Sequence, residues 1–356
     1  MINKRPESDI RYQRQQLFAP LGKDGDAQLR LSSVLVVGCG ALGSHVAELL
    51  ARAGIGRLVL VDRDIVEWSN LHRQVGFTEQ DAQDGTPKAT AFAAHIDAIN
   101  STVNVRAEVA DFNARTARPL ADGIDLIVDG TDNLPTRYLI NDLGLELEMP
   151  WVYGGAVGQE AHAQLFVPGV GPCLRCVLPE LPPAGTLPTC DTAGVIGPAP
   201  AAAASYEAAL AIRYLASKGA DIDPLVGHWI RLRLWDVDAR VSRVRRDPNC
   251  PACGRGERTF LEGDVAESST VLCGRGAVQV LPASESTTNE FDLDALAKRL
   301  SDSGEVDCRG ILLRFRPEQS DARDTRLTVF RDGRAIVEGT SDPTVARGLY
   351  NRYIGQ

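Results

Sequence analysis

A strand, a glycine-rich turn and a helix follow one another near the start of the chain, and this order constrains the fold more than any other feature. Residues 33–38 (SVLVVG) are apolar and mostly β-branched, GCGALG contributes Gly38, Gly40 and Gly43, and the helical pattern SHVAELLARAG follows. A second apolar run, LVLVD, occupies 58–62. Strands without polar alternation are typical of a parallel sheet covered on both faces. The pattern therefore predicts a βαβ unit.

The residues that follow repeat this alternation. Apolar runs predict strands at 103–109, 125–130 and 151–154, and helical patterns occupy 86–100 and 134 to about 148. Strands that alternate with helices predict a Rossmann-like, doubly wound α/β sheet whose strands are mostly parallel.

After Tyr153 the pattern changes. AHAQLFV (161–167) predicts an antiparallel strand, residues 168–200 are Pro- and Gly-rich and predict a loop, and 201–219 predict a helix before two paired strands, RLRLWDV and ARVSRVR. From about Phe260, short strands and helices with the Asp-Gly turn of FRDGRA predict a separate small α+β unit. We therefore expect two domains, 1–258 and 259–356.

The composition is that of a soluble globular protein, with 44% apolar and 24% charged residues. A formal net charge of −9 argues against broad nucleic-acid binding, which needs a basic face. No apolar run is long enough to cross a bilayer, and the N-terminus lacks a signal-peptide core. We expect a cytoplasmic protein with neither a nucleic-acid nor a membrane partner.

The glycine turn predicts a nucleotide site. Backbone N–H groups at the start of a helix favour phosphate oxygens. Asp62, at the end of the second strand, is placed to accept hydrogen bonds from a ribose hydroxyl. These residues serve NAD and ATP equally well, and a glycine turn that only permits tight packing is the simpler alternative.

Polar residues further along the chain favour ATP. Asn70 and Arg73 follow the second strand, and Lys88 begins a helix. Two fixed cations and an amide fit a triphosphate better than a pyrophosphate that backbone groups already hold. Asp132, in the turn after the strand at 125–130, can hold the Mg²⁺ that accompanies ATP. Taken singly, each is compatible with a surface charge or a turn residue; together they predict ATP and Mg²⁺.

Five cysteines are candidates for chemistry. PCLRC and CPAC place Cys173, Cys176, Cys250 and Cys253 in two C-x-x-C pairs, which predict a closed tetrahedral Zn²⁺ site with a structural role. Four ordinary thiols are the alternative. Cys190 stands alone in PTCDTAGVIGP, between the two pairs, where it is either a reactive thiol or a bystander.

The motifs together resemble the ThiF/MoeB family, over residues 11 to about 255. The resemblance rests on the glycine turn through WSNLHRQ, on GTPKA and DGTDN, and on the paired C-x-x-C motifs. It implies an adenylyltransferase related to ubiquitin-activating enzymes, which adenylates the C-terminal glycine of a ubiquitin-like sulfur-carrier protein such as ThiS or MoaD. It further implies that Asp62 binds ribose, that Asn70, Arg73 and Lys88 bind phosphates, and that Asp132 holds Mg²⁺.

The same resemblance implies partners. Arg14, in RYQRQ, would reach into the site of a second subunit, which makes the protein a homodimer. Cys190 would attack the acyl adenylate or join an acyl-disulfide relay, with a cysteine desulfurase or another sulfur donor upstream. The carrier's tail would pass beneath 180–197, and its body would lie on the outer face near 161–167. The C-terminal unit, to which we assign no catalytic role, favours thiazole (thiamine) over molybdopterin synthesis.

Two other functions use part of these residues. An NAD-dependent oxidoreductase would use the glycine turn and Asp62, but it leaves Asn70, Arg73, Lys88, Asp132 and the paired cysteines unexplained. A non-catalytic relative would bind a carrier protein without the chemistry.

Overall fold

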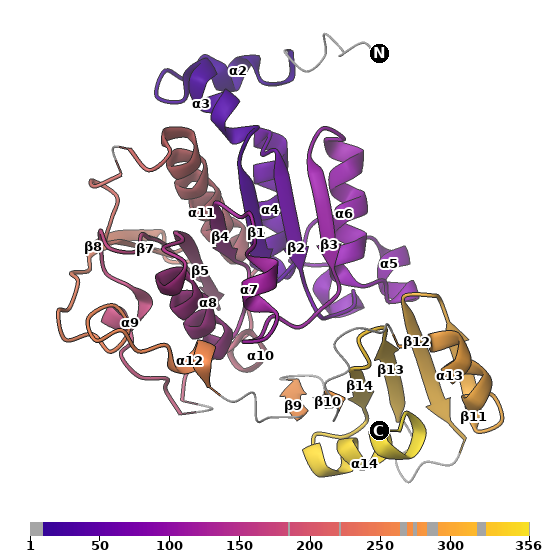
Figure 1. Ribbon diagram of the computed structural model, residues 1–356. Coiled ribbons are helices and arrows are strands. Elements are labelled where there is room, and N and C mark those ends of the chain that lie inside the picture. The colour runs from indigo at the N-terminus through magenta and orange to yellow at the C-terminus, as the bar shows by residue number, and fades with distance from the viewer. Residues whose placement is uncertain are drawn as a thin grey trace. The chain divides into compact units, whose positions relative to one another are not determined.

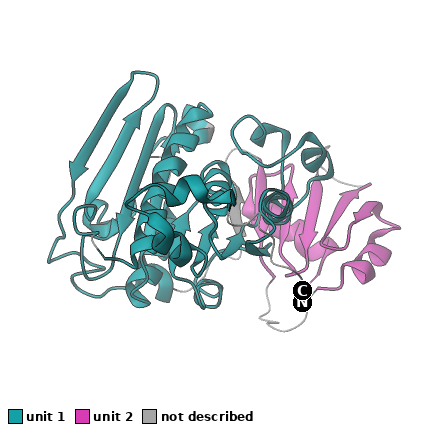
Figure 2. Ribbon diagram, turned by 90° about the horizontal axis from the view of Figure 1, so that it is seen from above, with its two compact units in different colours: residues 1–263 teal, residues 264–356 magenta. Residues whose placement is uncertain are grey.

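The computed structural model of the protein describes residues 10–183, 186–220, 222–263, 269–272, 276–282, 291–318 and 325–355. The chain divides into two compact units, Met1–Gly263 and Asp264–Gln356 (Figure 2). The short helix α12 (Thr259–Glu262) belongs to the first unit, because Leu261 is buried in the same core as Tyr138 of α8 (Leu134–Glu146).

The first unit is built on an eight-stranded sheet with the order β3-β2-β1-β4-β5-β6-β7-β8. The five strands from β3 to β5 run parallel, and β6, β7 and β8 continue the sheet in antiparallel register. The predicted Rossmann-like sheet with its antiparallel extension is therefore confirmed. Its strands are β1 (Ser33–Val37), β2 (Arg57–Val61), β3 (Asn104–Glu108), β4 (Leu126–Asp129), β5 (Trp151–Val157), β6 (Glu160–Phe166), β7 (His228–Arg233) and β8 (Asp238–Arg243).

Helices cover both faces of this sheet (Figure 1). One core joins α4 (Ala41–Ala53), α6 (Lys88–Ile99) and α11 (Pro198–Ser217) to one face, and a second core joins α7 (Ala117–Leu120) and α8 to the other. In β1, Val34 and Val36 enter the first core, while Leu35 and Val37 enter the second. Burial on both faces explains why the central strands are apolar throughout.

Short helices connect these elements. They are α2 (Gln13–Gln16), α3 (Gly22–Leu29), the 3₁₀ helix η1 (Trp68–Asn70), α5 (Glu79–Asp84), α9 (Leu174–Val177) and α10 (Cys190–Ala193). The helix predicted at 201–219 begins earlier, at Pro198, because proline fits the first helical turn, where no N–H is needed. No helix among the described residues is long and apolar enough to span a membrane.

The second unit is a six-stranded antiparallel sheet with the order β11-β12-β13-β14-β10-β9. Side chains of α13 and α14, among them Leu296 and Tyr350, share its core with Phe315 and Val329. The predicted Asp-Gly hairpin joins β13 to β14, with Gly333 at φ 80°. The elements are β9 (Ser269–Leu272), β10 (Ala277–Val280), α13 (Leu293–Leu300), β11 (Gly304–Cys308), β12 (Leu312–Pro317), β13 (Arg326–Phe330), β14 (Ala335–Glu338) and α14 (Pro343–Tyr353).

Candidate functional site

The glycine turn connects β1 to α4 in a conformation that only glycine permits. Gly38 has φ 88°, and a Cβ at Gly43 would lie 1.7 Å from the carbonyl oxygen of Gly38. Gly130, which follows β4, packs against the same oxygen, since a Cβ there would lie 2.3 Å away. No side chain caps the N-terminus of α4. The turn therefore leaves the N-terminal backbone of a thirteen-residue helix open to an anion.

Asp62 is hydrogen-bonded to this turn. Its Oδ2 accepts a hydrogen bond from the backbone N–H of Cys39, and its Oδ1 accepts one from Asp64, both at 2.7 Å. Burial raises the pKa of the Asp62 carboxyl, and the negative Asp64 adds to the rise, while Lys88 opposes it. The carboxylate that sequence analysis assigned to ribose thus lies beside the glycine turn.

Lys88 lies near the same two aspartates, Asp62 and Asp64. Its side chain is buried at the first position of α6, with Nζ 3.4 Å from Oδ2 of Asp64, and its backbone N–H donates to the Asp64 carbonyl at 2.9 Å. The pattern of the sequence did not single out Asp64, although it stands two residues after Asp62. The ammonium group therefore contacts the Asp64 carboxylate and lies close enough to Asp62 to lower the pKa of that carboxyl.

Asn70 and Arg73 lie in and after η1. Asn70 is buried, and its Oδ1 accepts from the Glu67 backbone N–H at 3.1 Å while the Glu67 side chain accepts from the Asn70 backbone. Arg73 Nη1 donates to the Ser69 carbonyl at 2.6 Å. Gln74, which sequence analysis missed, is buried next to Gly40, and its Oε1 has no hydrogen-bond partner among the described residues. Through Gln74, the segment that carries the predicted phosphate-binding residues Asn70 and Arg73 lies next to the glycine turn.

The turn after β4 carries Asp132, which is exposed. Asp129 anchors the turn: its buried carboxylate accepts from Thr131 N and Oγ1 at 2.9 and 2.6 Å and from Arg137 Nε at 2.8 Å. Arg137 Nη2 donates to the carbonyls of Thr131 and Gly154, both at 2.7 Å. Arg137, which the sequence did not reveal, thus ties β4, the Asp132 turn and β5 together.

Arg14 lies away from these residues. It is exposed on α2, next to Gln15, whose Nε2 donates to the carbonyl of Ala53 at the last residue of α4. The glycine turn lies at the other end of α4, about 20 Å away for a helix of this length. Figure 1 shows α2 and α3 at one end of the sheet and α10 at the other. Within one chain, the structure does not bring Arg14 to the glycine turn.

The segment that contains Cys190 crosses near β5. The predicted loop includes the short helix α10, whose N-cap Thr189 accepts from Thr192 N at 3.3 Å, and Cys190 is its first residue. Cys190 Sγ donates to the Ala156 carbonyl at 3.3 Å. Further on, Gly197 packs against His72, since a Cβ there would lie 3.0 Å from the His72 carbonyl oxygen. The segment therefore runs from the end of β5 to the turn that holds Arg73.

The paired cysteines form one cluster. The Sγ atoms of Cys173, Cys176, Cys250 and Cys253 all lie within 4.8 Å of one another. The Sγ atoms of Cys173 and Cys250 are 3.5 Å apart, and those of Cys176 and Cys253 are 3.4 Å apart. These distances are close to the sulfur–sulfur separation of about 3.8 Å that tetrahedral Zn–S bonds require. Burial raises the pKa of the Cys176 thiol to about 11. The donor set and its spacing fit a tetrathiolate metal site.

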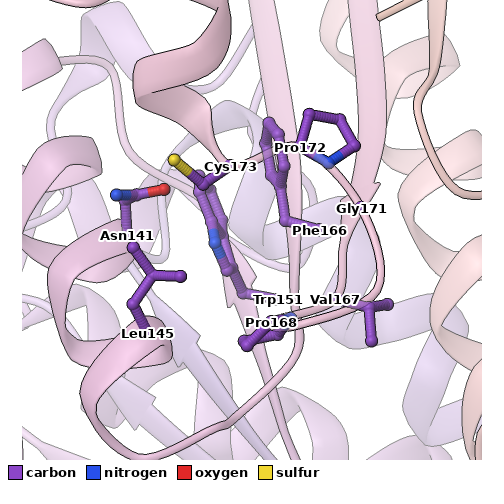
Figure 3. A pocket seen from close by; sticks show the side chains of 9 residues that line it. All are labelled: Asn141, Leu145, Trp151, Phe166, Val167, Pro168, Gly171, Pro172 and Cys173. Carbon is purple, nitrogen blue, oxygen red and sulfur yellow. The ribbon is translucent and has the colours of Figure 1, made fainter. Parts of the chain in front are cut away.

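A small cavity of about 10 Å³ lies beside this cluster (Figure 3). Asn141 of α8 lines it, and its Oδ1 accepts from the backbone N–H of Leu174 at 2.8 Å, next to Cys173. The buried Nδ2 of Asn141 has no hydrogen-bond partner among the described residues. Asn141 thus attaches the first cysteine pair to the helical layer of the first unit.

Glu207 of α11 is a buried carboxyl outside the predicted site. It is fully buried, and neither oxygen has a hydrogen-bond partner among the described residues. It lies against Gly154 of β5, where a Cβ would come within 2.2 Å of Oε2. Burial and the nearby Asp129 raise the pKa of Glu207 far above its usual range, and Arg137 only partly opposes this.

The chain is similar in sequence to one family of known proteins. A protein-family model described as the ThiF family matches residues 12–252. The sulfur carrier protein ThiS adenylyltransferase of Bacillus subtilis (strain 168) is 38% identical over 97% of this chain and 99% of its own length. The sulfur carrier protein adenylyltransferase of Thermus thermophilus is 41% identical over 68% of this chain and 90% of its own length.

Solved structures share the fold. Escherichia coli MccB, crystallised with ATP, superposes with a TM-score of 0.58 over 68% of this chain and 74% of that chain. At 24% identity this likeness shows the architecture alone. The family model, by contrast, matches the region that contains the glycine turn, the polar residues at the carboxyl edge of the sheet and three of the four paired cysteines, Cys173, Cys176 and Cys250. The chain belongs to the ThiF family.

Proposed function

We propose that the protein is an adenylyltransferase that uses ATP to activate the C-terminal glycine carboxylate of a small ubiquitin-like sulfur-carrier protein. The observation that carries the proposal is the position of Asp62, which is bonded to the glycine turn with the buried Lys88 beside it. The carboxyl edge of the sheet thus combines a candidate ribose acceptor, a helix N-terminus without a side-chain cap and a cation. The names of the Bacillus subtilis and Thermus thermophilus relatives support the same activity.

These residues would bind a nucleoside triphosphate. Asp62 would accept from the ribose hydroxyls, while the glycine turn at Gly38, Gly40 and Gly43 receives phosphate oxygens. Lys88 and Arg73 would hold the phosphate chain, and Asn70 would fix the turn from which Arg73 extends.

Asp132 fits a Mg²⁺ ligand, because an exposed carboxylate at the carboxyl end of a strand is the oxygen donor that this ion prefers. The buried contacts of Arg137 and Asp129 would hold its turn in place. When bound, Mg²⁺ neutralises charge on the polyphosphate.

The proposed step needs no general base, because a terminal carboxyl has an ordinary pKa of about 3.3–3.7 and is already ionised at neutral pH. The glycine carboxylate oxygen attacks the α-phosphorus, the bond from that phosphorus to the bridging oxygen breaks, and pyrophosphate leaves with both bonding electrons. The obstacle is repulsion between two anions. Lys88 and Arg73 would lower it and stabilise the charge that grows on pyrophosphate.

We also propose a homodimer in which Arg14 of one subunit serves the pocket of the other. The exposed Arg14 lies about one length of α4 from its own glycine turn, so a contribution to catalysis requires a second copy.

Cys190 Sγ would attack the acyl carbon of the adenylate, form a thioester and release AMP, or it would join an acyl-disulfide relay that receives sulfur from a donor such as a cysteine desulfurase. Its Sγ is half-buried at the N-terminus of α10, on the segment that crosses from β5 towards Arg73. We propose that the carrier's tail passes beneath 180–197, of which 184 and 185 lie outside the described residues, and that its body lies on the outer face near β6.

The cysteine cluster would bind Zn²⁺ as a structural ion. Four thiolates fill a tetrahedral shell and leave no position for a substrate, so the ion would connect the segment after β6 to the segment after β8. Thiolates and ATP both fit a cytoplasmic enzyme.

We favour thiazole synthesis over molybdopterin synthesis as the pathway in which the protein acts. The ThiS adenylyltransferase of Bacillus subtilis matches the chain through the C-terminal unit, to which we assign no catalytic role. The oxidoreductase interpretation draws no support from the family or from the named relatives.

The direct test is ATP–pyrophosphate exchange with purified carriers. We expect exchange that requires a ThiS-type carrier with an intact terminal glycine and that disappears with the same carrier lacking its last residue. Exchange that ignores the tail, or no exchange with either a ThiS-type or a MoaD-type carrier, would reject the proposed function.

A further inference from the structure

We propose that His72 is a positioning residue for Arg73, and that together with the Ser69 carbonyl it holds the guanidinium for phosphate binding. Arg73 Nη1 lies 2.6 Å from the Ser69 carbonyl oxygen and 2.9 Å from Nε2 of the His72 imidazole. This inference rests on the proposed function, since it concerns how the same pocket binds ATP.

The two contacts use one end of the guanidinium. Arginine carries five N–H donors in a rigid plane, and the two hydrogens on Nη1 match the two acceptors, Ser69 O and His72 Nε2. Nε and Nη2 of Arg73 have no hydrogen-bond partner among the residues that the structure describes. That edge is the one that binds two oxygens of a phosphate side by side. The contacts therefore fix the group and leave its phosphate-binding edge open.

The backbone that carries both side chains is itself fixed. The N–H groups of Arg73 and Gln74 donate to the Asn70 carbonyl at 3.1 and 3.0 Å, and Asn70 is held by its reciprocal contacts with Glu67. On the other side, Gly197 packs against the His72 carbonyl. The imidazole thus projects from a rigid turn, so that its ring nitrogen can restrict the rotamers of the long Arg73 side chain.

The role depends on an acceptor atom at one place. A guanidinium only donates, so the ring nitrogen that faces it must carry a lone pair. Glutamine places Oε1 the same number of bonds from Cβ as His72 Nε2, whereas leucine fills similar space without an acceptor. His72→Gln is therefore the conservative variant, and His72→Leu is the disruptive one.

The test is calorimetric titration of ATP with Mg²⁺ into the full chain, with thermal melting of each variant alongside. We expect His72→Leu to raise the Kd for ATP about tenfold, the size expected when one long side chain must be ordered on binding. His72→Gln should restore most of the affinity, and the melting temperature of all variants should stay near that of the natural protein.

A double variant separates positioning from a direct effect of His72. In an Arg73→Ala background, His72→Leu should change the Kd no further, because no guanidinium remains to be held. An unchanged Kd in the single variant, no rescue by glutamine, or an equal loss in the Arg73→Ala background would overturn the proposal. ATP binding does not require a carrier, so absent pyrophosphate exchange would reject the proposed function separately.

Discussion

Asp62 Oδ2 accepts a hydrogen bond from the backbone N–H of Cys39 at 2.7 Å, which joins the end of β2 to the glycine turn after β1. The other oxygen accepts from Asp64 N, so that one carboxylate satisfies two backbone donors. The contact joins the candidate ribose-binding residue to the candidate phosphate-binding turn. It also makes Asp62 a structural residue as well as a candidate ligand.

Asp62→Asn should weaken both roles. An amide has one oxygen, so either Cys39 N–H or Asp64 N–H would face an NH₂ group, and a lost buried acceptor costs about 1–3 kcal/mol. We expect this loss in urea unfolding together with at least about a tenfold rise in the ATP Kd, since one charge-assisted contact is worth about 1.5–3 kcal/mol. Normal affinity with normal stability would show that Asp62 serves neither purpose.

Arg137→Met should destabilise the first unit by about 3–5 kcal/mol, because it leaves the fully buried Asp129 carboxylate without its cation. Adding Asp129→Asn should recover much of this loss in urea unfolding. The control is Arg118→Met, which breaks the exposed pair with Glu146 and should cost no more than about 1 kcal/mol. Equal effects of the two arginine variants would contradict the structural role of Arg137.

Glu207→Gln should stabilise the protein increasingly as the pH rises. The folded-state pKa of Glu207 is far above its unfolded value of about 4.3, so between the two values the unfolded chain has lost a proton that the folded chain keeps. The stability of the natural protein is thus fully present below the unfolded pKa. It falls by about 1.4 kcal/mol for each pH unit of rise between the unfolded and the folded pKa.

Unfolding of the Glu207→Gln variant at pH 4.5 and pH 8 checks this sign. The variant should gain at least about 1.4 kcal/mol on the natural protein over that range. Glu146→Gln is the control, and its stability relative to the natural protein should change in the opposite direction between the two pH values. The reason is that Arg118 lowers the pKa of Glu146, so the exposed pair favours the ionised carboxylate at pH 8. A constant difference at both pH values would mean that Glu207 is ionised when folded.

Removal of metal should unfold part of the first unit. We expect one Zn²⁺ per chain by elemental analysis, and a strong chelator should lower the melting temperature, because the ion would join two segments 77 residues apart. Cys250→Ser should lower the metal content in the same way. A metal-free protein with an unchanged melting temperature would argue for four ordinary thiols.

Mixing two inactive variants tests the placement of Arg14. If Arg14 acts across a dimer, Arg14→Ala and Lys88→Ala should each lack exchange activity, and their mixture should regain activity in heterodimers. One of the two pockets in a heterodimer would then have Lys88 and receive Arg14 from its partner. Active Arg14→Ala protein, or no recovery on mixing after confirmed subunit exchange, would contradict the placement.

The main sheet follows from local sequence pattern. The central strands are apolar throughout because helices cover both faces, and Gly38 is required because its φ is positive. These are properties of short segments, so the βαβ unit was predictable. The helices α7, α9, α10 and α12 have four residues each, which is too short for helical periodicity to appear.

The missing parts of the site depend on contacts between distant segments. Gln74 is buried beside Gly40, and Glu207 is buried against Gly154. Glutamine and glutamate are usually exposed, so neither burial could be predicted from the residue type. Arg137 stands on an ordinary helical turn, and only the fold brings it to the carbonyl of Gly154. The sequence contains these residues, but their partners are set by which surfaces meet.

Transfer of AMP to a protein tail is the central step of the proposed reaction, and the mass of the carrier measures it most directly. After incubation of the protein with ATP, Mg²⁺ and a ThiS-type carrier, we predict a carrier heavier by one adenylyl group (AMP less water) at its terminal glycine, and no such product with Lys88→Ala. A carrier that keeps its original mass while the natural protein binds ATP normally would contradict the account.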